Sequence, residues 1–413
     1  MEYGLIGEKL GHSYSKIIHE LIGIYKYDLK EIPKDELKDY ILSKDYKGLN
    51  VTIPYKQDVI PLLDSIDAGA EAIGAVNCIV NREGKLYGYN TDYYGLKKLI
   101  ESSGHNLLNK KVLILGTGGT SKTAMKVVED LGAKEIIKVG RQKREGNISY
   151  EEALELHLDA DAIVNTTPSG MYPNIDAKPL SLKLFAKLEV LIDVIYNPPR
   201  TKLMLEAEEL GIDAYGGLKM LVYQAIAAAE LFCDCKIEEE KSLKIYRQVR
   251  NENENIVLIG MPAVGKSTLG RMLAKELSME LIDTDTEIVK KEGRQISDIF
   301  ANEGEKYFRD VESEIVKECS LKKGVIIATG GGAILREENV SVLKSFGKLI
   351  LLNRPLESLI PTGNRPLASD RDKITKLYNE RMPIYNKIAD VIVDGGNGVE
   401  AEVSAVKRFL DEN

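Results

Sequence analysis

The stretch IVLIGMPAVGKSTLG, Ile256 to Gly270, decides the fold of the C-terminal part of this 413-residue chain. An apolar run is followed by the complete pattern GxxxxGK[ST], which is typical of a buried strand, a phosphate-binding loop and a helix. In such a loop the backbone N–H groups surround the phosphates, a lysine reaches the β- and γ-phosphate oxygens, and a hydroxyl group binds Mg²⁺. The sequence therefore predicts a P-loop domain with a parallel sheet and a nucleotide site at Met261, Pro262, Ala263, Val264, Gly265, Lys266, Ser267 and Thr268.

A second strand, glycine-rich turn and helix lie upstream, in KVLILGTGGTSKTAMKVVEDLG at residues 111–132. The apolar runs before both turns are rich in β-branched residues, as is typical of strands that a parallel sheet buries on both faces. Between the two patterns, NENEN at residues 251–255 carries no apolar residue. We predict that it is a linker between two domains.

The first 250 residues are expected to divide again. Short strand patterns (YGLIG, GLNVTI, NCIVN) alternate with helical patterns before residue 105, and a long helical pattern follows Gly217. We predict an α/β chain with a leading α/β substrate lobe at residues 1–104 and 218–250, a Rossmann-type lobe at 105–217, and the P-loop domain at 256–413.

Composition and charge restrict the possible partners. The chain is 44% hydrophobic and 29% charged, its formal net charge is -8 and its pI is near 5.4. This balance gives no electrostatic reason to expect nucleic acid or an anionic membrane as a partner. The chain shows neither a signal-peptide pattern nor an apolar run of membrane-spanning length, so we expect a cytoplasmic location. The sequence leaves the oligomeric state open.

The four cysteines, Cys78, Cys233, Cys235 and Cys319, do not form a disulfide framework or a zinc-ligand spacing. Cys233 and Cys235 could hold a metal, but no further cysteine or histidine lies near them in the sequence. Reduced thiols are the favoured interpretation, in agreement with a cytoplasmic location.

The upstream glycine turn, Gly116-Thr117-Gly118-Gly119, is a weaker signal because Ser121 stands at the third glycine position of GxGxxG. The next strand pattern ends in Gly140-Arg141-Gln142-Lys143-Arg144, where an NAD-binding lobe normally places an acidic residue. Basic side chains there suit the 2′-phosphate of NADP, although a solvated basic turn is the simpler alternative. With the glycine turn beside them, we predict NADP.

Three segments of the leading lobe carry more polar residues than folding requires: GHSYS, GLNVTIPYK, and AVNC with YNTD. Hydroxyls, amides, one lysine and one carboxylate are the set that holds a small polyhydroxylated acid. Each residue also has a purely structural interpretation. Lys56 could be a surface lysine, Asp92 a helix N-cap and Asn77 a turn residue.

In order along the chain, GLIGEKLGHSYSKIIHE, GLNVTIPYK, GAVNC, YNTD, GTGGTSKTA, NTTPSGM, DVIYNPPRT and GGLKMLVYQ resemble the shikimate dehydrogenase family over residues 1 to about 240. The resemblance implies reduction of 3-dehydroshikimate to shikimate with NADPH. It implies that Lys56 is the catalytic acid/base, paired with Asp92, and that the substrate contacts Ser13, Ser15, Thr52, Asn77, Asp92, Tyr196 and Gln224. It also implies that NADP contacts Gly116, Thr117, Gly118, Gly119, Thr120, Arg141, Thr166, Val194 and Gly217.

The phosphate loop does not indicate which molecule accepts the phosphoryl group. That information comes from the other motifs of the C-terminal part. LIDTDTEI brings Asp283 and Asp285 to the end of a predicted strand, and GEKYFRDVE, ATGGGA, GNRPLA and ERMPIY follow. Together these resemble the shikimate kinase family over residues 256 to about 410. The resemblance implies transfer from ATP to shikimate, with Asp285, Arg309, Gly331 and Arg381 at the acceptor and Arg365 in a lid. It also implies that Ser267 and Asp283 hold Mg²⁺ and that Asp285 and Lys266 are catalytic.

The leading hypothesis is thus a bifunctional enzyme that catalyses two consecutive steps. Two alternatives remain open from the sequence. The first half could act on quinate or a related hydroxy acid, or use NAD, and one half could be a nucleotide-binding module without turnover. The reacting Lys56 argues against a pure binding module, because binding alone does not need a proton donor.

Overall fold

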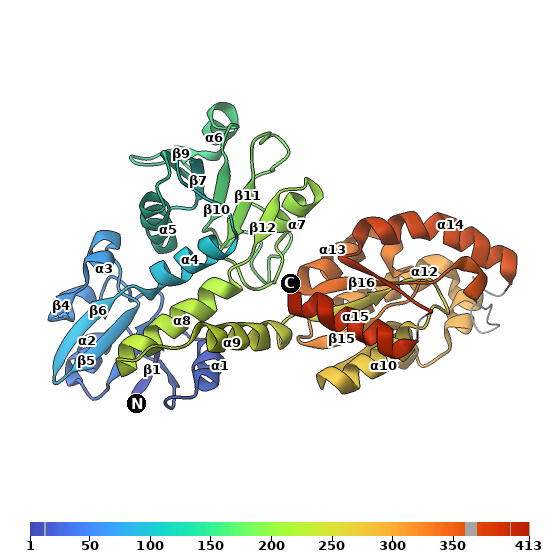
Figure 1. Cartoon of the computed structure of the whole chain (residues 1–413), viewed down its shortest axis with the longest axis horizontal. Helices are drawn as coiled ribbons and strands as arrows, with labels where there is room; N and C mark the ends of the chain where they lie inside the picture. The colour runs from blue at the N-terminus through green and yellow to red at the C-terminus, as the bar shows by residue number, and fades with distance from the viewer. Residues whose placement is uncertain (12–13, 360–369, 397, 413) are drawn as a thin grey trace. The chain divides into compact units, whose positions relative to one another are not determined.

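The computed structural model describes residues 1–11, 14–359, 370–396 and 398–412. It divides into two compact units, Met1–Val249 and Arg250–Asn413 (Figure 1). The first unit contains two six-stranded sheets and the second contains one five-stranded sheet.

The leading lobe of the first unit is built on a mixed sheet in the order β2-β1-β3-β5-β6-β4. Its strands are β1 (Tyr3–Gly7), β2 (Asp28–Glu31), β3 (Gly48–Val51), β4 (Ser65–Ile66), β5 (Cys78–Arg82) and β6 (Lys85–Tyr89). Its helical segments are α1 (Tyr14–Ile22), α2 (Leu37–Ser43), η1 (Ile60–Leu62) and α3 (Ala68–Ile73). Parallel pairing of β1 with β3 places the segments that follow both strands at one edge of the sheet.

The second lobe has a parallel sheet in the order β12-β11-β10-β7-β8-β9. Its strands are β7 (Lys111–Leu115), β8 (Glu135–Gly140), β9 (Ile148–Ser149), β10 (Ala162–Asn165), β11 (Val190–Asp193) and β12 (Asp213–Tyr215). Its helices are α5 (Gly119–Asp130), α6 (Tyr150–Leu156) and α7 (Lys202–Glu209). The direction of chain winding reverses between β7 and β10. In parallel sheets of this kind, ligands bind outside the carboxyl ends of the strands, at the place where the winding reverses.

Two helices connect the lobes, α4 (Thr91–Ser102) and α8 (Leu218–Cys233), which lie side by side (Figure 1). A Cβ at Gly95 of α4 would lie 2.4 Å from the carbonyl oxygen of Met220, so this glycine permits direct backbone contact. From α8 the chain returns to the leading lobe, where Val222 and Ile226 pack against Ile18 of α1. Helix α9 (Glu239–Asn251) completes this layer.

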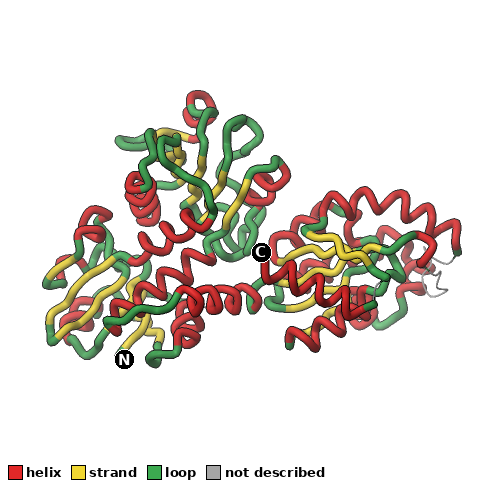
Figure 2. Tube along the Cα trace, in the orientation of Figure 1, coloured by secondary structure: helices red, strands yellow, loops and turns green. Residues whose placement is uncertain are grey.

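The second unit has a parallel sheet in the order β14-β15-β13-β16-β17, with helices on both sides (Figure 2). Its strands are β13 (Asn255–Ile259), β14 (Glu280–Asp283), β15 (Val325–Ala328), β16 (Gly347–Asn353) and β17 (Val391–Asp394). Its helical segments are α10 (Lys266–Leu277), α11 (Thr284–Glu292), α12 (Ile296–Ser320), η2 (Ala333–Leu335), α13 (Glu337–Phe346), η3 (Leu356–Ser358), α14 (Arg371–Ile388) and α15 (Val399–Glu412). Because β13 is central, the loop at its carboxyl end lies in the middle of the sheet edge.

The link between the units is shorter than the expected 251–255. Helix α9 runs to Asn251 and β13 begins at Asn255, which is only 1% exposed. The Asn255 amide donates to the carbonyl oxygens of Ser320 and Lys322, and its Oδ1 accepts from Val325 N–H. A polar residue is buried here because all its hydrogen-bonding groups find partners, which residue composition alone does not reveal.

No helix in the described ranges is long and apolar enough to cross a membrane. The four cysteines are free thiols. Within the same ranges, no three His, Cys, Asp or Glu side chains gather into a group that could hold a metal ion.

Candidate active sites

The first unit contains a cavity of about 320 Å³ at the carboxyl ends of its strands. Residues from both lobes and from α8 line it, so neither lobe forms it alone. It brings together ten of the predicted site residues: Ser15, Thr52, Lys56, Asn77, Asp92, Thr120, Val194, Tyr196, Gly217 and Gln224. Ser13 lies outside the described residues.

A lysine–carboxylate pair lies at the wall of this cavity. Lys56 Nζ is 2.5 Å from Asp92 Oδ2, and the side chains are 26% and 16% exposed. Asp92 is not the N-cap of α4, because Asn90 occupies that position and accepts from Tyr93 N–H. The Asp92 carboxylate is therefore available to Lys56, and the ammonium group is held beside the cavity with one edge toward solvent.

The amide residues behind the pair form a fixed polar network. The carbonyl oxygen of Asn77 accepts from Val51 N–H at 2.8 Å, and its side-chain Oδ1 accepts from Thr91 N–H at 2.7 Å. Asn50, which sequence reasoning missed, also lines the cavity, and its Oδ1 accepts from the Tyr27 hydroxyl at 2.8 Å. A signal for Asn50 was present, since it is an amide between the apolar residues of GLNV. These hydrogen bonds fix the positions of the Asn50 and Asn77 side chains at the cavity wall.

The opposite wall comes from the segments that follow β11 and β12. A Cβ at Gly217 would lie 2.0 Å from the carbonyl oxygen of Val194, so only glycine allows these two segments to meet. The Tyr196 ring packs edge-on against Tyr14, with 5.4 Å between ring centroids. Burial raises the pKa of Tyr196, which keeps its hydroxyl protonated as a hydrogen-bond donor.

The other predicted cofactor residues lie outside this cavity but along the same sheet edge. Gly116 has φ +115°, and a Cβ there would lie 2.6 Å from Thr166 Oγ1, which joins the turns after β7 and β10. A Cβ at Gly140 would lie 2.8 Å from Thr117 Cγ2, which shows that the end of β8 lies against the glycine turn. Arg141 is the next residue and is exposed, so its side chain begins beside that turn. Positions that a Cβ would take at Gly118 and Gly119 have no described protein atom within 4 Å. This open space before the N-terminus of α5 fits a pyrophosphate.

Asp193, at the end of β11, joins the two loops that carry Thr166 and Tyr196. Its carboxylate is fully buried and accepts from Asn165 Nδ2 at 3.1 Å, Thr201 Oγ1 at 2.8 Å and Ile195 N–H at 3.0 Å. Burial raises the pKa of Asp193 to about 6, and the three donors offset only part of this effect. The negative charge is therefore costly at neutral pH.

Because the buried negative charge of Asp193 is unfavourable, we predict that the stability of the first unit depends on pH. The folded pKa of Asp193 is about 6 against an ordinary 3.8, so the folded state favours the protonated acid and loses stability as pH rises from about 4 to 6. The loss has an upper limit of about 3 kcal/mol. Asp193→Asn should remove much of this dependence. The pH dependence of stability is measured by urea unfolding, monitored by hydrogen exchange of peptides from the loops that carry Thr166 and Tyr196. An unchanged pH dependence in the variant would contradict the assignment.

The second unit contains a larger cavity, of about 920 Å³, at the carboxyl edge of its sheet. It brings together twelve predicted residues: Pro262, Ala263, Val264, Gly265, Lys266, Ser267, Thr268, Asp283, Asp285, Arg309, Gly331 and Arg381. Met261 is buried and does not line it. Arg365 lies outside the described residues.

The phosphate loop has the backbone conformation that its sequence requires. Gly260, Ala263 and Gly265 have φ of +142°, +65° and +106°, which turns successive peptide groups toward one concave face. A Cβ at Gly260 would lie 2.6 Å from the carbonyl oxygen of Leu352, so this glycine also permits close contact with β16. Lys266 Nζ donates to the carbonyl oxygens of Gly260 and Met261 at 2.8 and 3.0 Å. The lysine is thereby held across the loop.

The predicted metal residues meet beside this loop. Ser267 Oγ donates to Asp283 Oδ2 at 2.7 Å, and Asp283 Oδ1 accepts from the N–H groups of Asp285 and Thr286. One hydroxyl and one carboxylate fit Mg²⁺, which usually takes few protein ligands together with phosphate oxygens and water. The strand ends at Asp283 and Asp285 stands in the first turn of α11, so the two carboxylates converge through a helix start rather than along a strand.

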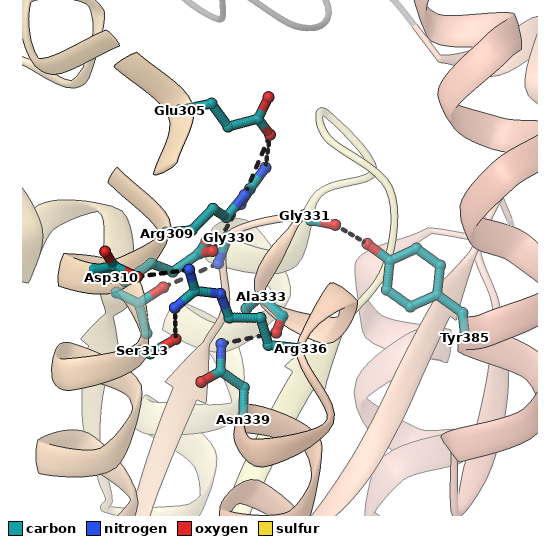
Figure 3. Close-up of polar contacts among 12 residues, drawn as sticks. Glu305, Arg309, Asp310, Ser313, Gly330, Gly331, Ala333, Arg336, Asn339 and Tyr385 are labelled. Carbon is teal, nitrogen blue, oxygen red and sulfur yellow. Dashed lines mark hydrogen bonds and ion pairs between the residues drawn. The ribbon is translucent and has the colours of Figure 1, made fainter. Parts of the chain in front are cut away.

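Arg309 lies between two carboxylates of its own helix, of which Glu305 is labelled in Figure 3. Its Nη1 donates to Glu312 at 2.6 Å, while Nε and Nη2 both donate to Glu305 Oε1 at 3.3 and 3.1 Å. Burial opposes the charge on Arg309, but the two carboxylates outweigh it and raise the pKa of the guanidinium. Arg381 is 4% exposed and also lines the cavity, so two buried cations face the same space.

The glycine loop after β15 is fixed against these arginines. The Tyr385 hydroxyl lies 2.6 Å from the carbonyl oxygen of Gly331, and Asn339 donates to Ala333 (Figure 3). A Cβ at Gly332 would lie 2.1 Å from Arg309 Nη1, so the guanidinium lies directly against this glycine. Sequence reasoning missed Glu312 and Tyr385. Glu312 could have been found from its three-residue spacing to Arg309 on a helix.

Comparisons with known proteins agree on both units. A family model described as shikimate dehydrogenase substrate binding domain matches residues 5–79, and one described as shikimate kinase matches residues 262–411. The shikimate dehydrogenase (NADP(+)) of Clostridium perfringens strain ATCC 13124 is 39% identical over 266 residues, which cover 60% of this chain and 98% of that protein.

Solved structures match the same part of the chain. A chorismate mutase/shikimate 5-dehydrogenase fusion protein from Clostridium acetobutylicum is 40% identical with a TM-score of 0.58, covering 60% of this chain and 96% of that one. Shikimate 5-dehydrogenase from Thermus thermophilus, in complex with NADP(H) and shikimate, is 26% identical with a TM-score of 0.54, covering 60% and 99%.

Proposed function

The chain belongs to the shikimate dehydrogenase family and carries a shikimate kinase domain, and from this premise we propose that one polypeptide catalyses two consecutive reactions. The first is NADPH-dependent reduction of 3-dehydroshikimate to shikimate. The second is ATP-dependent phosphorylation of shikimate to shikimate 3-phosphate. The observation that carries this proposal is the presence, in one chain, of the Lys56–Asp92 pair in one cavity and the phosphate loop facing Asp285 and Arg309 in another.

In the first site Lys56 is the proton donor. NADPH, when bound, supplies the hydride, and negative charge then develops on the oxygen of the 3-ketone. A lysine ammonium within hydrogen-bond reach stabilises this charge and donates its proton. Asp92 keeps the ammonium beside the ring and orients a ring hydroxyl. Ser15, Thr52, Asn77, Tyr196 and Gln224 supply the remaining polar contacts from the cavity wall.

In the second site the acceptor is the hydroxyl that this reduction creates. Bound ATP would supply the phosphoryl group, and Ser267 and Asp283 would hold Mg²⁺, which would neutralise the phosphate oxygens. Lys266 reaches the transferring phosphate, Asp285 accepts or orients the acceptor hydroxyl, and Arg309 and Arg381 bind the carboxylate of shikimate.

Arg141 is proposed to select NADP through the 2′-phosphate. Arg141→Glu reverses the charge at that place, so it should raise the KM for NADPH by at least about tenfold and change the KM for NADH much less. Steady-state kinetics with both cofactors measure the ratio. Lys143→Glu is the matched control, because Lys143 lies in the same basic turn but pairs with Glu152 at 2.5 Å. Equal losses with both cofactors would refute the assignment.

The experiment that tests the whole proposal combines both steps. The purified chain is incubated with 3-dehydroshikimate, NADPH, ATP and Mg²⁺, and shikimate and its phosphate are separated over time. NADPH oxidation followed by a phosphorylated product supports the proposal. Quinate offered with NAD(P)⁺, and NADH in place of NADPH, test the alternative substrate and cofactor. If one unit shows no catalytic activity in this experiment, the alternative that it is a nucleotide-binding module without turnover is supported instead.

We infer a cytoplasmic location, as for other enzymes of this biosynthetic class. The four free thiols support it, because disulfides are rare in reducing compartments. The proposed partners are small molecules, 3-dehydroshikimate and shikimate. The net negative charge of the chain gives no electrostatic attraction for nucleic acid.

A further inference from the structure

The two carboxylates on Arg309 hold it in unequal ways. Glu312 is 1% exposed and contacts Nη1 at 2.6 Å, so it is a buried partner at short distance. The Glu305 side chain is 53% exposed and uses a single oxygen for both Nε and Nη2, at 3.3 and 3.1 Å. Two longer bonds to one oxygen of an exposed side chain form a weak pair.

Glu305 covers the edge of Arg309 that recognises carboxylates best. The Nε and Nη2 hydrogens point in parallel and can meet both oxygens of one carboxylate, which makes two good bonds in place of the shared one. Nη1 is already taken by Glu312, and Gly332 lies against the guanidinium. An incoming carboxylate can therefore use this edge only by replacing Glu305.

The backbone beside Glu305 allows that exchange. Gly304 interrupts α12 with φ +82° and ψ 174°, and a Cβ at its position would meet no described atom within 4 Å. Glu305 thus follows a break in the helix, and its side chain is about half exposed while it contacts Arg309. Its side chain can leave Arg309 without disturbing the packed core, since the released carboxylate is hydrated by water.

We propose that Glu305 tunes the affinity of the phosphorylation site for its acid substrate: its carboxylate occupies the place of the substrate carboxylate and must be displaced when the substrate binds. This rests on the proposed function. The exchange keeps Arg309 neutralised in both states, because one carboxylate replaces another. A neutral ligand cannot make the exchange and leaves the Glu305–Arg309 pair in place. Because only an acid must displace Glu305, the pair lowers the affinity of the site for acids and leaves its affinity for uncharged polyols of the same shape unchanged.

Glu305→Gln tests the proposal by the sign of the change. Without the competing carboxylate, the KM for shikimate in the kinase reaction should fall about two- to fivefold, with kcat nearly unchanged. Affinity measured by titration calorimetry should rise equally, and calorimetry is the suitable method because the chain has no tryptophan. Binding of shikimate methyl ester should stay the same. If Glu305 only orients Arg309, the variant should instead show a higher KM, which would overturn the proposal.

Two further variants complete the experiment. Glu314→Gln removes an equally exposed charge from the same helix, where Glu314 pairs with Lys291 at 3.0 Å, and should leave the KM unchanged. An equal decrease in this control would mean a general charge effect and would count against Glu305. Glu305→Asp retains the charge on a shorter side chain and should give an intermediate KM, and it serves if the glutamine variant does not fold. Wild-type protein that fails to phosphorylate shikimate would refute the proposed function, whereas wild-type activity with an unchanged or raised KM in Glu305→Gln would refute only this inference.

Discussion

Lys56→Ala should lower the rate of NADPH-dependent reduction of 3-dehydroshikimate by a factor of about 10² to 10⁴, while shikimate phosphorylation continues at the wild-type rate. Lys56 Nζ is the ammonium group that Asp92 holds at the cavity, 2.5 Å from its Oδ2. Without it, the oxygen that gains negative charge has no positioned proton donor. The loss should appear in kcat more than in KM, because the interaction strengthens only as charge develops.

Lys34→Ala is the matched control for this experiment. Lys34 belongs to the same lobe, and its exposed side chain pairs with Asp58 at 3.6 Å, so its removal also deletes one positive charge. The control should keep both activities. Undiminished reduction by Lys56→Ala would disprove the assignment of the first site. Loss of both activities together would point to misfolding rather than to chemistry.

Lys266→Ala should give the reverse pattern, with phosphorylation lowered by a factor of about 10² to 10³ and reduction unchanged. Lys266 is held across the phosphate loop by the carbonyl oxygens of Gly260 and Met261, within the cavity that also contains Ser267 and Asp285. Its removal leaves charge on the transferring phosphoryl group without the ammonium group that the loop holds in place. Single-turnover phosphorylation with saturating ATP separates this loss from weaker nucleotide binding.

Lys275→Ala tests whether any lysine of the same helix would have this effect. Lys275 stands in the last turn of α10, exposed and away from the loop. Full phosphorylation by this variant together with full reduction by Lys266→Ala is the expected result. A Lys266→Ala protein that phosphorylates at the wild-type rate would remove the lysine from the reaction.

Both glycine-rich turns could be predicted from the sequence because their requirements are local. Gly260 and Gly265 adopt positive φ, and Lys266 and Ser267 follow at fixed positions on the helix. Gly116 likewise turns directly out of β7. A residue that must adopt a particular backbone conformation leaves a signal at its own position, and no knowledge of distant contacts is needed.

The pairing of side chains was less accessible. Asp92 fits the pattern of a helix cap, and only the structure shows that Asn90 caps α4 and leaves Asp92 to Lys56, 36 residues away. Asn255 belongs to a polar run that reads as a linker, yet it is buried because three backbone groups satisfy its amide. Hydrogen bonds between distant segments decide both cases, and composition does not record them.

The sequence by itself determined the two strand–turn–helix units and the phosphate loop and, through two family resemblances, predicted the residues of both sites. Only the tertiary structure decided which carboxylates neutralise Arg309, namely Glu312 and Glu305, and that Asn90 rather than Asp92 caps α4. The physical reason is that backbone conformation depends on neighbours in the chain, whereas the partner of a charge depends on which side chains folding brings within a few ångströms and on how much water remains around them.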